Sequence, residues 1–136
     1  MDLDVMAIIA HLAIYCSDLE SMRAFYMKYF GAQSNGRYTN KKKGFNSYFL
    51  SFGESPMRLE LMTRVDVKEG KEVQHTERLG LTHFAIQLDT DAAVNELTNQ
   101  LRGDGFTIAG EPRRTGDGYY ESVILDPEGN RVELVG

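Results

Sequence analysis

An internal repeat constrains the fold of this 136-residue chain more than any other feature of its sequence. The segments 8–15 and 81–88 are both rich in strand-forming residues, and both contain the pattern His-x-Ala-Ile. His11 and His83 occupy the same place in the two copies, 72 positions apart. Similar segments at a fixed separation indicate two copies of one supersecondary unit.

Each half also closes on a strand that carries a glutamate between two apolar residues. Glu60 lies between two leucines, and Glu133 lies between a valine and a leucine. The two glutamates are 73 positions apart, which is almost the same offset as that of the histidines. Two independent landmarks that share one offset make a duplicated module a better explanation than chance.

One helix and several short β-type segments are expected in each half. The first helix should begin at a cap, Ser17 or Asp18, and end at Gly31. The second helix should be capped within 89–91 and end near Gly103. The strands expected after the helices are 46–53 and 57–63 in the first half, and 105–110, 119–125 and 131–135 in the second.

These elements predict an α+β fold made of two tandem βαβββ modules within a single domain, 1–136. The first module covers about 5–64 and the second covers about 80–136. The polar segment 65–79 is the expected connector between them. His75 lies in this connector, has no counterpart in the other half, and is expected to be a surface residue.

Strand alternation predicts where the glutamates point. Successive side chains of a strand face opposite sides of the sheet, so the leucines beside Glu60 share one face and the carboxylate takes the other. Glu133 follows the same rule between its apolar neighbours. A single strand glutamate is usually just exposed, and a single strand histidine is usually a hydrogen-bonded wall residue. Repetition of both in two modules favours a shared site.

Four residues are therefore the candidate ligands of one divalent metal ion: His11, Glu60, His83 and Glu133. Imidazole and carboxylate ligands suit zinc, nickel, cobalt, manganese or iron, and the lack of sulfur ligands argues against a closed structural zinc site. Four protein ligands in an octahedral sphere would leave two positions for water or substrate.

Charge and composition argue against some classes of partner, and a small-molecule substrate is the partner expected for the candidate site described above. A net charge of -5 disfavours nucleic acid. No apolar run approaches the roughly 20 residues needed to cross a bilayer, so no membrane span is expected. The acidic N-terminus does not resemble a secretory signal, and the single cysteine, Cys16, cannot form an internal disulfide. Both features predict a cytoplasmic protein.

Other residues are weaker candidates for the site. Three arginines could hold an anionic substrate group, with surface solubility as the ordinary alternative: Arg37, Arg113 and Arg114. Five aromatic residues could line a pocket, although strand aromatics usually pack the sheet: Tyr48, Phe49, Phe52, Tyr119 and Tyr120.

Several stretches of the chain are typical of one known family. They are the opening 11–15 (His-Leu-Ala-Ile-Tyr), the helix end 25–32, the repeat opening at His83, and the closing stretch 125–134 (Leu-Asp-Pro-Glu-Gly-Asn-Arg-Val-Glu-Leu). On these motifs, essentially the whole chain resembles the vicinal oxygen chelate superfamily. This group contains glyoxalase I, fosfomycin-resistance thiol transferases, extradiol dioxygenases and methylmalonyl-CoA epimerase. The resemblance implies a curved, barrel-like mixed sheet with the helices outside, and a homodimer.

The glyoxalase I-like branch, related to lactoylglutathione lyase, matches the ligand pattern best. Its members carry His or Gln, Glu, His and Glu at the four module positions, which here are His11, Glu60, His83 and Glu133. The resemblance implies that Glu133 moves the substrate proton, with Glu60 serving the opposite face. It also implies zinc or nickel ahead of other ions, and a hydroxycarbonyl or hemithioacetal substrate that passes through a metal-stabilised enediolate. A thiol cosubstrate such as glutathione is left open.

Other activities stay open on the same frame: epimerase, thiol transferase, dioxygenase, or non-enzymatic binding of a small molecule or antibiotic. Dioxygenases and fosfomycin-resistance enzymes generally use two histidines and one glutamate, so Glu60 fits them less well. Bleomycin-binding relatives lack the ligands, and the intact set here disfavours pure sequestration. The sequence does not decide whether each metal site lies within one chain or is shared across the dimer.

Overall fold

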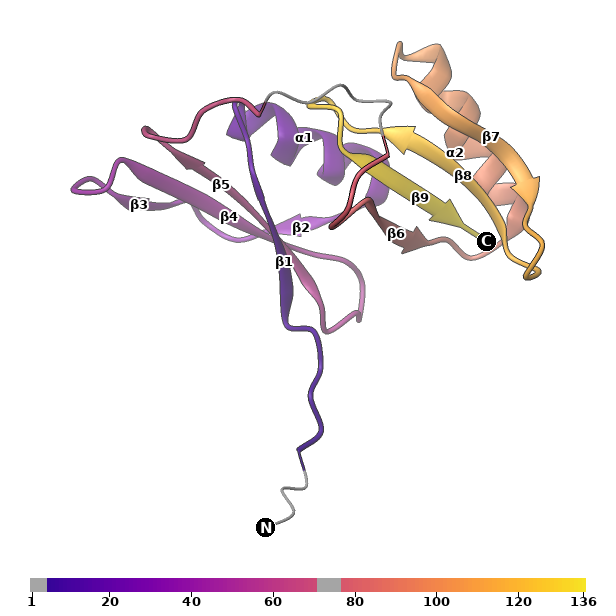
Figure 1. Cartoon of the computed structure of the whole chain (residues 1–136), viewed down its shortest axis with the longest axis horizontal. Helices are drawn as coiled ribbons and strands as arrows, with labels where there is room; N and C mark the ends of the chain where they lie inside the picture. Colours follow the sequence, from indigo (N-terminus) through magenta and orange to yellow (C-terminus); the bar gives the residue numbers. More distant parts are fainter. Residues whose placement is uncertain (1–4, 71–76) are drawn as a thin grey trace. The chain divides into compact units, whose positions relative to one another are not determined.

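The computed structural model describes residues 5–70 and 77–136, and the chain divides into two units, Met1–Lys68 and Glu69–Gly136. Each unit contains one helix on one face of its own β-sheet (Figure 1). The elements of the first unit are β1 (His11–Tyr15), α1 (Leu19–Phe30), β2 (Gln33–Ser34), β3 (Tyr38–Asn40), β4 (Phe45–Ser51) and β5 (Arg58–Arg64). Those of the second unit are β6 (His83–Gln87), α2 (Asp91–Gly103), β7 (Ile108–Arg114), β8 (Tyr120–Leu125) and β9 (Arg131–Val135).

Both sheets are mixed and have the same strand order. The first runs β1-β5-β4-β2, with β3 also paired to β4, and the second runs β6-β9-β8-β7. In each, the first strand of the unit pairs in parallel with the last, and the remaining pairs are antiparallel. The predicted α+β class, with two tandem modules that each contribute a helix and a sheet, is confirmed.

The repeat seen in the sequence extends to the pairing of individual residues. In the first unit Ala13 lies opposite Glu60, and in the second Ala85 lies opposite Glu133. The two histidines likewise both lie opposite an arginine of the partner strand. Equivalent residues therefore have equivalent neighbours, which is what a duplicated module requires.

The short strands β2 and β3 were not predicted. Both pair with β4, β2 near its end and β3 near its beginning, so together they take the place that β7 takes beside β8. The pairing of β7 with β8 is itself interrupted by register shifts on either side of Gly110. Strands of two or three residues are too short to show a period-2 pattern, so sequence periodicity could not reveal them.

The helices form as their caps predict. Asp18 accepts a hydrogen bond from the Ser21 backbone N–H at 3.0 Å at the start of α1, and Gly31 ends this helix with a φ of 64°. Thr90 caps α2 by accepting from the Ala93 N–H at 3.1 Å. Satisfying the unpaired N–H groups of the first turn fixes where each helix begins.

The core of each unit lies between the helix and one face of the sheet. In the first unit the buried side chains of α1 pack toward β4 and β5, where Leu59 and Leu61 are almost fully buried. In the second unit α2 packs toward β8, and Val132 and Leu134 of β9 are completely buried. Because side chains alternate along β5 and β9, the opposite face of each sheet is left to the glutamates, as predicted.

None of the helices in the described parts of the chain is both long and apolar enough to cross a membrane. Cys16 is buried and is not part of a disulfide, and its thiol lies 3.7 Å from the carbonyl oxygen of Ile14. The predicted surface position of His75 lies outside the described residues.

Candidate metal centre

The second unit holds an imidazole and a carboxylate in direct contact. His83 is the first residue of β6, and Glu133 lies two positions beyond the residue opposite it on β9, so both side chains share the face away from α2. The His83 Nε2 lies 2.9 Å from the Glu133 Oε2. The glutamate side chain is only 18% exposed and the histidine 39% exposed. The carboxylate is therefore largely shielded from solvent, while the imidazole stays accessible to a ligand.

Thr82 orients the ring of His83. Its Oγ1 lies 2.7 Å from the Nδ1 of His83, a hydrogen bond that directs the other ring nitrogen toward Glu133. When Nδ1 carries the proton and donates it to Thr82, Nε2 presents a lone pair. The Thr82 hydroxyl can either donate or accept this hydrogen bond, so the contact orients the ring and is compatible with the tautomer that a histidine ligand needs.

The first unit holds the equivalent pair at a longer distance. The His11 Nε2 lies 3.6 Å from the Glu60 Oε1, and the glutamate is again the more sheltered partner, at 15% exposure. The rings of His11 and Phe49 meet edge to face, with 5.4 Å between their centroids. The Arg58 guanidinium lies 4.2 Å from the centroid of the same Phe49 ring. Phe49, one of the five candidate aromatic residues, therefore lies on the same sheet face as Glu60.

The donor chemistry of these pairs fits a divalent ion. Each pair offers an imidazole nitrogen and a carboxylate oxygen, the ligand types that zinc and its neighbours accept. Donors about 2.0–2.2 Å from one ion and at right angles lie about 3 Å apart, which is close to the His83–Glu133 separation. Across residues 5–70 and 77–136, no group of three or more His, Cys, Asp or Glu side chains is placed to hold an ion. That all four ligands meet on one ion stays a prediction.

Glu121 is a site residue that the sequence did not single out. It lies on β8 opposite Val135, two positions along from the residue opposite Glu133, so the two glutamates share one face. Glu121 is close enough to Glu133 to affect its titration. Burial, and then Glu121, raise the pKa of Glu133 above its usual value, although the charges of His83 and Arg113 oppose the shift. The counterpart of Glu121 in the first unit is Ser47, so the repeat gave no signal for it.

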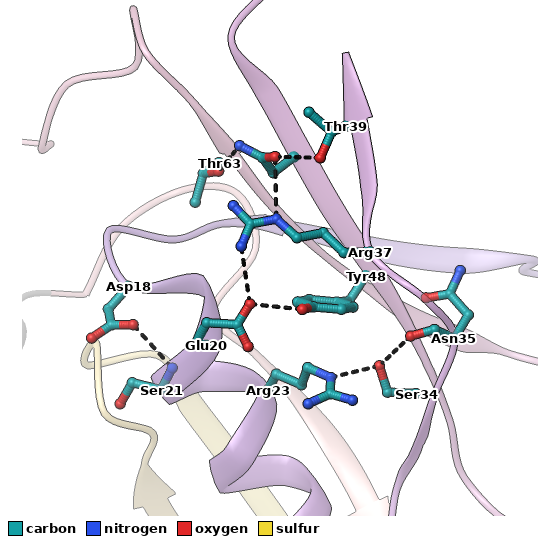
Figure 2. Close-up of polar contacts among 11 residues, drawn as sticks. Asp18, Glu20, Ser21, Arg23, Ser34, Asn35, Arg37, Thr39, Tyr48 and Thr63 are labelled. Carbon is teal, nitrogen blue, oxygen red and sulfur yellow. Dashed lines mark hydrogen bonds and ion pairs between the residues drawn. The ribbon is translucent and has the colours of Figure 1, made fainter. Parts of the chain in front are cut away.

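The structure separates the three candidate arginines. Arg37 donates to the Glu20 carboxylate at 3.2 Å and to Asn46 at 3.2 Å (Figure 2). Arg114 is held by Asp91 at 2.6 Å and by the carbonyl of a β7–β8 turn residue. Arg113 lies opposite Glu121 on β7, and therefore on the face that carries Glu133. Only Arg113 of the three shares a sheet face with a predicted ligand.

The polar cluster drawn in Figure 2 belongs to the helix side of the first sheet. Tyr48 donates to the Glu20 carboxylate at 2.7 Å, and this hydrogen bond, followed by burial, raises the pKa of Tyr48. Arg23 lies 4.7 Å over the Tyr48 ring and donates to Ser34. Tyr48 lies opposite the buried Leu61, so it joins helix to sheet rather than facing the ligands.

Comparison with known proteins places the sequence of this chain in a family. The family model described as "Glyoxalase/Bleomycin resistance protein/Dioxygenase superfamily" matches residues 8–134. Two relatives come from Bacillus subtilis strain 168. The uncharacterized protein YqjT is 28% identical, covering 92% of this chain and 95% of its own length, and the uncharacterized protein YwkD is 31% identical, covering 83% and 95%.

Solved structures of similar fold include enzymes of the glyoxalase type. The trypanothione-dependent glyoxalase I of Leishmania major has a TM-score of 0.74 at 22% identity, with 96% of this chain and 87% of that chain covered. The lactoylglutathione lyase of Agrobacterium tumefaciens has a TM-score of 0.66 at 24% identity, with 98% and 95% covered. At these identities the likeness establishes the fold.

Proposed function

Because the chain belongs to the glyoxalase/bleomycin resistance protein/dioxygenase superfamily, we propose that it is a metal-dependent lyase or isomerase of the glyoxalase I type. The substrate is a small hydroxycarbonyl compound or a hemithioacetal. The observation that carries the proposal is the duplicated His–Glu pair, set at the same register in both sheets and on the face away from each helix. His11, Glu60, His83 and Glu133 are the proposed ligands of one divalent ion, with zinc or nickel preferred.

A bound ion of this kind acts as a Lewis acid and stabilises negative charge on neighbouring substrate oxygens. The chain's own part in the reaction is to hold and move a proton. Glu133 would accept the proton from the carbon beside the carbonyl and return it to the neighbouring carbon, through an enediolate. In the metal-free protein burial and then Glu121 raise the pKa of Glu133, and a bound cation would act in the opposite direction. Glu60 would serve the opposite face of the substrate.

The proposal extends to the assembly of the protein. Two chains would form a homodimer, so that four modules build two metal sites. Sedimentation of the metal-loaded protein at several concentrations measures this directly. A monomer at all concentrations that still binds one ion per chain would remove the dimer from the proposal without removing the site.

The decisive experiment is a screen of the purified protein loaded in turn with zinc, nickel, cobalt, manganese and iron. Hemithioacetals formed from a 2-oxoaldehyde and several thiols, glutathione among them, are offered in deuterated water. We expect isomerisation, with solvent deuterium entering at the carbon beside the carbonyl whenever proton exchange competes with return. Tight stoichiometric binding without turnover would instead assign the protein as a binding module.

A variant tests the role of Glu133 separately from the fold. Glu133→Gln keeps the size of the side chain and removes its basicity, so turnover should be abolished at metal concentrations that saturate the variant. Metal content is measured in the same sample. Normal turnover in metal-loaded Glu133→Gln would show that another group moves the proton.

A further inference from the structure

The two histidines of the proposed metal centre differ in what lies beside the second ring nitrogen. Thr82 precedes His83, and its hydroxyl oxygen lies 2.7 Å from the His83 Nδ1. Ala10 takes the same place before His11 and has no hydroxyl. Within the part of the chain that the structure describes, the His11 ring makes no hydrogen bond and meets Phe49 edge to face. The repeat therefore breaks at the residue that precedes each histidine.

The contact with Glu133 decides where the proton of His83 lies when no ion is bound. The His83 Nε2 lies 2.9 Å from the Glu133 Oε2, which is a hydrogen-bond distance. An ionised carboxylate can only accept a hydrogen bond, so Nε2 carries the proton in this contact. A neutral imidazole has one such proton, which leaves Nδ1 as an acceptor. In this state the Thr82 hydroxyl therefore donates to Nδ1.

A histidine ligand needs the opposite arrangement, because it coordinates through a nitrogen that carries no proton. Nε2 is the His83 nitrogen that lies beside Glu133, the other proposed ligand of this unit, so Nε2 must lose its proton. The proton of the neutral ring is then on Nδ1, next to the Thr82 oxygen. A hydroxyl both donates and accepts, and its hydrogen rotates freely. One oxygen can therefore satisfy Nδ1 in both tautomers without moving.

On this geometry we propose that Thr82 is a positioning residue whose hydroxyl reverses its hydrogen bond with His83 when the metal ion binds. The hydroxyl donates to Nδ1 before binding and accepts from the Nδ1–H after binding, with the Nε2 lone pair left for the ion. Nε2 releases one proton to water and Nδ1 takes one from water, so the charge of the ring is unchanged. The inference rests on the proposed function, because it needs the metal centre. It also makes the two histidine ligands unequal.

Zinc affinity measures what the hydroxyl contributes. Thr82→Val keeps the branched shape of the side chain and removes the hydroxyl. Because loss of a group that supports a ligating histidine typically weakens metal binding about 10- to 100-fold, the Kd for zinc should rise about tenfold or more. Thr82→Ser restores the hydroxyl and should stay within about threefold of wild type. The Kd of the full-length protein is obtained by competition with a chromophoric zinc chelator.

The matched control makes the same substitution elsewhere in the second unit. Thr107 is exposed, and its backbone carbonyl accepts a hydrogen bond from the Leu125 N–H. Thr107→Val removes a threonine hydroxyl and leaves this backbone contact in place. It should bind zinc as wild type does.

Heteronuclear NMR of the ring nitrogens reports the tautomer of each histidine. The chain has three histidines, and their signals are assigned by replacing each one in turn. His83 should be the Nε2–H tautomer in the chelator-treated protein and the Nδ1–H tautomer in the zinc-loaded protein. Thr82→Val should shift the Nδ1 signal of His83, since its hydroxyl partner is gone. The His11 signals of the chelator-treated protein should stay as in wild type.

The outcomes separate this inference from the proposed function. An Nδ1–H tautomer or a doubly protonated His83 ring in the chelator-treated protein would overturn the reversal. Equal zinc affinity of wild type and Thr82→Val would also overturn it, as would an equal loss in Thr82→Ser, and in both cases the metal centre stands. A wild-type protein that binds no zinc would refute the metal centre, and the inference with it.

Discussion

Replacing Glu133 by glutamine should leave the metal-free protein at least as stable and should reduce the stabilisation that a bound metal ion adds. Burial and Glu121 raise the pKa of Glu133 in the folded state. A raised pKa means that the contribution of this group to stability is complete below its unfolded pKa, about 4.3, and is lost as the pH rises through the folded value. At pH 7 the ionised carboxylate therefore weakens the fold. The neutral glutamine should leave the metal-free protein equally stable or more stable.

When the metal ion is bound, the ionised carboxylate should stabilise the protein, because Glu133 is one of the proposed ligands. An ion that binds only the folded state adds about 2.7 kcal/mol at a concentration one hundred times its Kd. If glutamine weakens binding tenfold, the same concentration adds only about 1.4 kcal/mol. For a chain of 136 residues, 1 kcal/mol corresponds to about 4 °C in Tm. The metal-induced rise in Tm should therefore be about 5 °C smaller in Glu133→Gln.

Thermal unfolding followed by circular dichroism, with a chelator or with zinc at fixed concentration, measures both effects. Glu111→Gln is the matched control, because this glutamate lies on β7 of the same sheet but pairs with Arg102 at the surface. It should keep the full metal-induced shift. A shift of equal size in wild type and Glu133→Gln would refute the assignment of Glu133 as a ligand. A marked loss of stability in metal-free Glu133→Gln at pH 7 would refute the reasoning about its burial.

Four further predictions concern the metal and the frame that carries it. His83→Ala should purify with less metal than wild type by elemental analysis, and equal contents would count against the site. Thr90→Ala removes the cap of α2 and should lower the free energy of unfolding in urea by about 1 kcal/mol. Leu134→Ala opens a cavity at a fully buried position and should cost about 2–5 kcal/mol in the same assay. Tyr48 donates a hydrogen bond to Glu20, and its pKa is raised in the folded state. The stabilisation that its protonated hydroxyl gives to the fold is therefore complete below about pH 10 and is lost as the pH rises through the folded-state pKa. Wild type should therefore lose more stability than Tyr48→Phe above pH 10, and parallel curves would contradict this.

Local chemistry explains why much of the fold was predictable. Asp18 begins α1 because its side chain accepts a hydrogen bond from a backbone N–H of the first turn, and Gly31 ends the helix in a left-handed conformation. Both effects are local and need no distant partner. The strands around Glu60 and Glu133 were predictable because alternation along a strand decides which side chains face the helix. Duplication then paired each glutamate with its histidine, because equal offsets imply equal register.

The sequence by itself determined the duplicated frame and the two His–Glu pairs, since both follow from patterns within one strand and from a repeat along the chain. Only the tertiary structure showed that Glu121 and Arg113 lie on the site face, where both affect the pKa of Glu133, while Arg37 and Arg114 are paired elsewhere. These facts depend on the register between strands, and a slip of one residue moves a side chain to the other face of the sheet. Register is set by turns, bulges and packing together, so it is decided when the sheet forms and cannot be read from one strand alone.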